Sequence, residues 1–116
     1  MTNEQKIEVL QTLLGEGGEV PPEATLQAYL NISEMEILNW KYHLVGGVPD
    51  GVTSVSPADE GAQIYAVIAG YTHAGAEGEK QHNENGINRV FIYSDMIDYI
   101  RNHVLPLVRV GAVTQS

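Results

Sequence analysis

The chain has 116 residues, no cysteine and a formal net charge of −9, which is typical of a single domain with one modest core. The lack of cysteine excludes a disulfide scaffold, a thiolate metal site and a thiol nucleophile. Residues 1–60 carry ten acidic residues and only two lysines. Such a surface argues against a protein that wraps DNA, because it gains nothing from counterion release.

The first predicted helix covers about residues 3–14. Thr2 and Gln5 have the spacing of a capping box, in which each side chain bonds the other residue's backbone. Apolar residues then recur at helical spacing, and Gly15 is a candidate C-cap. A helix this short needs tertiary packing to persist.

The second predicted helix covers about residues 22–44, with Pro22 near its first position. One apolar stripe runs along it, made of Leu26, Leu30, Ile37, Trp40 and Leu44. Ser33 interrupts the stripe and begins a second capping-box pattern, so a break there is the alternative. The stripe keeps its phase across Ser33, which favours one long helix. Trp40 is interpreted as a core anchor in preference to a ligand platform.

The third predicted helix covers about residues 57–74. Ser56 is the expected N-cap and Pro57 the first helical residue. One face is apolar and the opposite face is rich in alanine, which favours close packing at the centre of the core. Gly75 and Gly78 are expected to stop the helix and to open a polar loop over about residues 75–86.

Residues 85–110 combine a turn signal, an apolar alternation and a fourth helix. Asn85-Gly86 is typical of a two-residue hairpin turn, and a short strand is expected after it. The fourth helix is predicted over about residues 95–105, and Pro106 ends it. Residues 107–110 are open to three interpretations: an edge strand, an interface segment or a mobile tail.

Together these patterns predict a mainly α fold over residues 1–116. The fold is a small four-helix bundle with a long polar loop and a short β-strand or hairpin between the third and fourth helices. No apolar run approaches the roughly 20 residues of a membrane span, and the polar first residues predict no signal peptide.

The sequence assembles no recognisable catalytic or metal site. The histidines (His43, His73, His82 and His103) include no pair with His-x₃-His spacing. Residues 75–80 superficially resemble a phosphate loop, but the Gly-Lys-Ser/Thr ending is absent and two glutamates would repel phosphate. The expectation is a protein that is not an enzyme and has no catalytic residue, metal or cofactor.

Several distinct motifs are spread over almost the whole chain, from about residue 4 to 110. They are Leu13-Leu14-Gly15, Glu34-Met35-Glu36-Ile37-Leu38-Asn39-Trp40, Gly75-Ala76-Glu77-Gly78, Gly86-Ile87-Asn88-Arg89-Val90-Phe91 and Ser94-Asp95-Met96. In this respect the sequence resembles the head–tail connector (head-completion, or adaptor) proteins of long-tailed bacteriophages. It departs from their usual pattern at His73, where a basic residue is commoner, and in its longer Pro106-Leu107-Val108-Arg109 ending.

The resemblance implies a virion protein, assembled in the host bacterial cytoplasm and located at the head–tail joint. It would dock as a homo-oligomeric ring, commonly twelvefold, beneath the portal protein. The ring would extend the DNA channel and offer a platform to a tail-completion or stopper protein. DNA would pass through it without specific binding, and no membrane is involved. The residues expected to make subunit or portal contacts are Glu77, Glu79, Lys80, Arg89, Leu107, Arg109 and Val110.

Two other classes of function stay open. The chain has the features of a small helical regulatory or interaction adaptor, which would bind its partner without ring symmetry. A metal-dependent hydrolase that uses His73, His82 and Glu77 is the other alternative, and it requires a bound metal.

Overall fold

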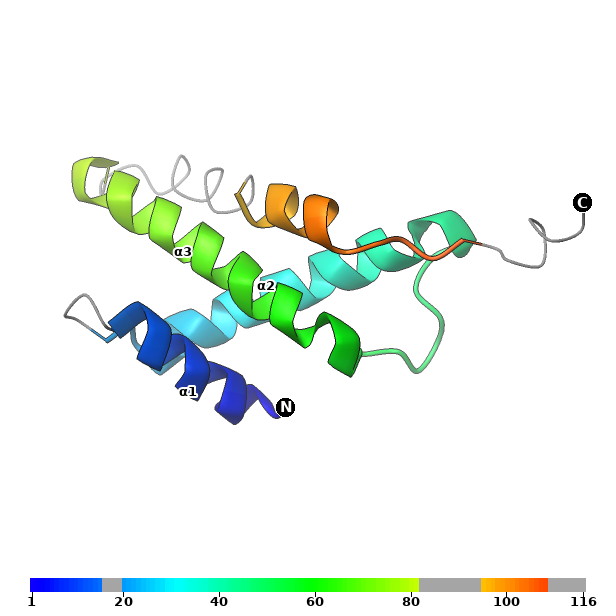
Figure 1. Cartoon of the computed structure of the whole chain (residues 1–116), viewed down its shortest axis with the longest axis horizontal. Coiled ribbons are helices and arrows are strands. Elements are labelled where there is room, and N and C mark those ends of the chain that lie inside the picture. The colour runs from blue at the N-terminus through cyan, green and yellow to red at the C-terminus, as the bar shows by residue number, and fades with distance from the viewer. Residues whose placement is uncertain (16–19, 82–94, 109–116) are drawn as a thin grey trace, which may run out of the picture.

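A computed structural model describes residues 1–15, 20–81 and 95–108, without the side chains of residues 73–81. Four α-helices and two 3₁₀ turns lie in these ranges, and the described residues contain no strand (Figure 1). The elements are α1 (Asn3–Leu14), α2 (Glu23–Tyr42), η2 (His43–Val45), η3 (Pro57–Asp59), α3 (Glu60–Gln81) and a C-terminal helix over residues 95–103. The prediction of a mainly α fold with four helices is therefore confirmed. The predicted strand or hairpin lies outside the described residues.

The capping box of α1 is confirmed. The Thr2 hydroxyl accepts a hydrogen bond from the Gln5 backbone N–H at 3.1 Å, and the Gln5 side chain accepts one from the Thr2 N–H at 2.8 Å. Two backbone donors at the helix start are thus satisfied reciprocally. Gly15 ends the helix in a right-handed conformation that any residue can adopt. Glycine is favoured here because the Val20 side chain lies 3.0 Å from where a Cβ of residue 15 would be.

The long second helix is also confirmed, without a break at Ser33. The Ser33 side chain is buried, and its hydroxyl donates to the Leu30 carbonyl at 3.0 Å within the helix. The Ser33 hydroxyl therefore bonds a carbonyl of the preceding helical turn and does not cap a new helix. α2 is followed by η2, and Gly46 ends this turn with a φ of 96°, a left-handed conformation that suits glycine.

The predicted end of the third helix is wrong. α3 continues through Gly75 and Gly78 to Gln81, so residues 75–81 of the predicted loop are helical. A glycine inside a helix costs only about 1 kcal/mol relative to alanine, and the intervening alanine, glutamates and Lys80 are good helix formers. The rest of the predicted loop, residues 82–86, lies outside the described residues.

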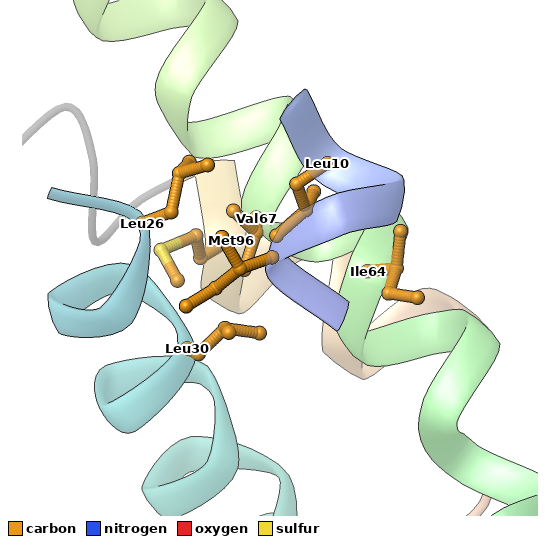
Figure 2. Packing of buried hydrophobic residues seen from close by; sticks show 7 residues of the cluster. Leu10, Leu26, Leu30, Ile64, Val67 and Met96 are labelled. Carbon is orange, nitrogen blue, oxygen red and sulfur yellow. The ribbon is translucent and has the colours of Figure 1, made fainter. Parts of the chain in front are cut away.

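The first part of the core joins all four helices. Figure 2 shows Leu10 of α1, Leu26 and Leu30 of α2, Ile64 and Val67 of α3 and Met96 of the C-terminal helix meeting in one cluster. Ile7 belongs to the same cluster. Met96 is fully buried, so the C-terminal helix is part of the core from its first turn.

The second part of the core lies farther along α2. Ile37 of α2 and Ala66 of α3 pack with Ile100 and Val104, and Val55 of the connection between α2 and η3 closes the cluster. Trp40 is half-buried against it. The C-terminal helix is therefore held along its length between α2 and α3.

A polar relay crosses the apolar core and connects three helices. The Lys6 ammonium of α1 donates to the Gln63 side chain of α3 at 2.6 Å, and the Gln63 amide donates to the Leu30 carbonyl of α2 at 3.1 Å. Lys6 is 3% exposed and Gln63 1% exposed. A buried ammonium is costly unless it is hydrogen-bonded. The Gln63 side chain is therefore needed as the acceptor for Lys6.

Gln63→Leu should lower the free energy of unfolding by about 2–4 kcal/mol, because it strands a buried ammonium. The double variant Lys6→Met/Gln63→Leu should recover to within about 1 kcal/mol of the parent, since no buried charge remains. Urea unfolding of both variants measures this, with Asn102→Ala at an exposed position as the control. A Gln63→Leu variant with the parental free energy of unfolding would contradict a stabilising role for the hydrogen bonds of Gln63.

Tyr29 of α2 and Tyr71 of α3 form an edge-to-face pair, with ring centroids 5.7 Å apart. Burial, followed by the charge of Tyr71, raises the pKa of Tyr29 to about 12. The folded state therefore favours the neutral phenol. This contribution to stability is present below the ordinary tyrosine pKa of about 10 and is lost as the pH rises toward about 12.

In a spectrophotometric titration Tyr29 should ionise near pH 12. Over pH 10–12 the free energy of unfolding should fall, and Tyr29→Phe should remove that part of the slope. A Tyr65→Phe variant is the matched control, because Tyr65 is 55% exposed. If the ionisation near pH 12 were still present in Tyr29→Phe, it would belong to a tyrosine other than Tyr29.

Candidate partner-binding surface

The chain that follows the C-terminal helix is held on the end of α2. The Trp40 indole N–H donates to the Val104 carbonyl at 2.7 Å, and the Leu107 backbone N–H donates to the Lys41 carbonyl at 2.8 Å. Residues 105–108 have no regular secondary structure. We refer to them as the apolar segment. In Figure 1 this segment runs along the end of α2 after the orange helix.

Between these two hydrogen bonds and beyond them, the apolar segment faces away from the core. Leu105 is 85% exposed, Leu107 40% and Val108 51%. Leu44, in the turn after α2, is also half-exposed. Apolar side chains gathered in one short stretch, unlike single ones scattered over a surface, are typical of a protein–protein contact.

A groove lies beside this segment, between α2 and the C-terminal helix. Its volume is about 250 Å³, and it is lined by Glu36, Asn39, Trp40, His43, Ile97, Ile100 and Arg101. We refer to it as the tryptophan groove. Apolar side chains from both helices and one charge of each sign therefore line the same hollow.

The Trp40 ring has an aromatic and a cationic neighbour. The His43 ring stacks on it with centroids 4.6 Å apart, and the guanidinium carbon of Arg101 lies 5.3 Å from its centre. A guanidinium over an indole is a favourable cation–π contact. Trp40 thus serves partly as a core anchor, as predicted, and partly as a wall of the groove.

The end of α2 is fixed from the opposite direction by an ion pair. The Lys41 ammonium lies 2.7 Å from the Asp59 carboxylate of η3 and donates to the Ser56 hydroxyl at 3.2 Å. The predicted N-cap, Ser56, makes no side-chain bond to the helix backbone and donates to Asp59 instead. Lys41 therefore links η3 with its ammonium and the apolar segment with its carbonyl.

Of the predicted contact residues, Leu107 is the one whose side chain the structure describes, and it lies in the apolar segment. Glu77, Glu79 and Lys80 lie on the last turns of α3, where only the backbone is described. Arg89, Arg109 and Val110 lie outside the described residues. Of residues 107–110, for which a strand, an interface segment and a mobile tail are the three interpretations, the described residues 107 and 108 form no strand, and the Leu107 N–H is bonded to α2.

The residues of the tryptophan groove were not predicted as a site. The sequence did hold one signal, the three-residue spacing of Trp40 and His43 on one helix face. His73, His82 and Glu77, the residues of the metal-enzyme alternative, have no described side chains. Within residues 1–15, 20–72 and 95–108, no group of three potential metal ligands occurs. No helix in the described part is long and apolar enough to cross a membrane.

Three comparisons with known proteins returned no match. No protein-family model, no curated protein and no solved structure is significantly similar to this chain.

Trp40→Phe should release the apolar segment while keeping an aromatic ring in the groove. The lost N–H donor should cost about 1 kcal/mol of unfolding free energy, and amide hydrogen exchange at Leu107 should accelerate. NMR exchange rates measure this, with Tyr65→Phe on α3 as control. If Leu107 exchanged at the parental rate, Trp40 would not be what holds the segment.

Proposed function

We propose that this chain is a structural virion protein of the head–tail connector type. It docks as a ring under the portal, extends the DNA channel and carries the tail or the next completion protein. One observation carries the proposal: the extended apolar segment is held on α2 by two backbone-directed hydrogen bonds while its own apolar side chains remain exposed. A segment presented in this way is suited to contact with a neighbouring molecule.

Charge supports the same role. The chain has a formal charge of −9, and a wall of like charge lets DNA pass without binding. The contacts are assigned to Leu107, Arg109 and Val110 at the C-terminal end, to Glu77, Glu79 and Lys80 on the last turns of α3, and to Arg89 between α3 and the C-terminal helix. A ring needs two different surfaces on each subunit, and these two groups of residues lie in different parts of the chain.

The first test is electron microscopy of lysates in which the gene is disrupted in a phage that carries it. Packaged or leaking heads should accumulate beside complete free tails. The double variant Arg89→Ala/Arg109→Ala should give the same picture while the purified protein keeps its parental melting temperature, because the proposed role of both residues is in contacts between molecules and not in folding of the monomer.

Leu107→Ser tests the apolar segment itself and should reduce infectious particles at least about tenfold, as expected for loss of an interface side chain worth about 1.4 kcal/mol or more. Met35→Ser is the matched control, since Met35 is an apolar residue of α2 with similar exposure, 48%. Normal tailed particles from the Arg89/Arg109 variant would rule out the connector role. A partner bound without ring symmetry would favour the adaptor alternative.

A further inference from the structure

We propose that the tryptophan groove of one copy binds the C-terminal segment of a second copy, residues 105–109. This deepens the ring described above and rests on that proposed function. The groove would receive apolar side chains of the segment against Trp40, Ile97 and Ile100, and Glu36 would pair with Arg109.

The size of the groove favours side chains over a cofactor. Its volume is about 250 Å³, whereas sites for small molecules and cofactors usually measure about 300–1,000 Å³. The apolar side chains of Trp40, Ile97 and Ile100 suit the tryptophan groove to one or two aliphatic groups. Tryptophan and arginine, here in contact with each other, are the residue types that most often dominate protein interfaces.

The occupant has to come from another molecule. In the same chain, Val104 is bonded to the Trp40 indole and Leu107 to the Lys41 carbonyl. These two bonds hold the segment along the end of α2, and the Leu105 side chain between them is 85% exposed. A segment tethered at both positions cannot turn back into its own groove, but its exposed side chains are free to enter a neighbour's.

Charge complementarity selects the second copy as the partner. Glu36 lines the groove and forms no ion pair with any residue that the structure describes. Arg109 follows the apolar segment directly and is the only lysine or arginine after Arg101. Glu36 is therefore the complement of Arg109 in the groove, while Arg101 is directed to the Trp40 ring.

The geometry of such a contact is head-to-tail. The groove and the segment are different surfaces of one chain, so each copy would use one surface on each neighbour. Contacts of this type produce a closed ring when the rotation between copies closes. The groove–segment contact thus supplies the kind of interface that the proposed ring requires.

The test uses the absence of cysteine in the chain. Asn39→Cys places one thiol at the groove, and Leu105→Cys places one on the segment of a ¹⁵N-labelled copy. Mixed at millimolar concentration with a short bis-maleimide, the two full-length variants should give heterodimers. Their yield should be at least about tenfold above that of a control pair in which Gln5→Cys, on α1, replaces the groove thiol.

A charge exchange in trans identifies the ion pair. Glu36→Arg in the groove copy, or Arg109→Glu in the segment copy, should each lower the cross-link yield about fivefold, which corresponds to about 1 kcal/mol for a partly exposed pair. Combining the two altered copies should restore it. Yields equal to the Gln5 control, or the absence of restoration, would overturn the inference.

The outcomes separate this inference from the proposed function. Defective particles from the Arg89→Ala/Arg109→Ala variant, without any groove–segment cross-link between the cysteine variants, would leave the connector role standing and overturn the self-contact. A specific, charge-restorable cross-link together with normal tailed particles would support the self-contact and overturn the connector role.

Discussion

The arrangement of the helices depends on one buried cation. The Lys6 ammonium has left water, and Gln63 accepts its hydrogen bond at 2.6 Å while donating to the Leu30 carbonyl. Since an unsatisfied ammonium in an apolar core is far more costly than any single apolar contact, this relay restricts how α1, α2 and α3 slide along one another. Ser33 donates to the same carbonyl, so a residue that interrupts the apolar stripe of α2 belongs to the polar centre of the fold. The two apolar clusters of the core then pack between helices whose relative positions this relay restricts.

Local rules predicted what depends on neighbours in sequence. The capping box of α1, the unbroken α2 and the helical start at Pro57 follow from residues within a few positions of one another. The relay was not predicted, because Lys6 and Gln63 are 57 positions apart and each has the sequence context of a surface residue. The ion pair of Asp59 with Lys41 was not predicted either, because these residues are 18 positions apart. Gly75 was read as a stop, whereas the strong helix formers around it outweigh a cost of about 1 kcal/mol.

In the candidate site, too, features set by neighbouring residues could be predicted, and features set by contacts between distant residues could not. Leu107 is an expected contact residue under the resemblance, and in the structure it lies on an exposed segment tethered to α2. The tryptophan groove could not be predicted, because it exists only where residues 36–43 meet residues 97–101, and no local pattern brings those helices together. Trp40 joins the two features, since its ring forms one wall of the groove and its N–H holds the segment.

The charge of the chain limits how copies can associate under the proposed function. Two molecules that each carry a formal charge of −9 repel one another at distances up to about a Debye length, roughly 8 Å at physiological ionic strength. Contacts between them therefore have to be apolar or locally complementary, which is the character of the apolar segment and of Glu36 opposite Arg109. Such contacts act over short range, so free chains stay apart while chains already placed side by side on a common platform gain the full contact. An acidic subunit with a neutral, extended segment is thus suited to assemble where a template concentrates it and to remain dispersed elsewhere.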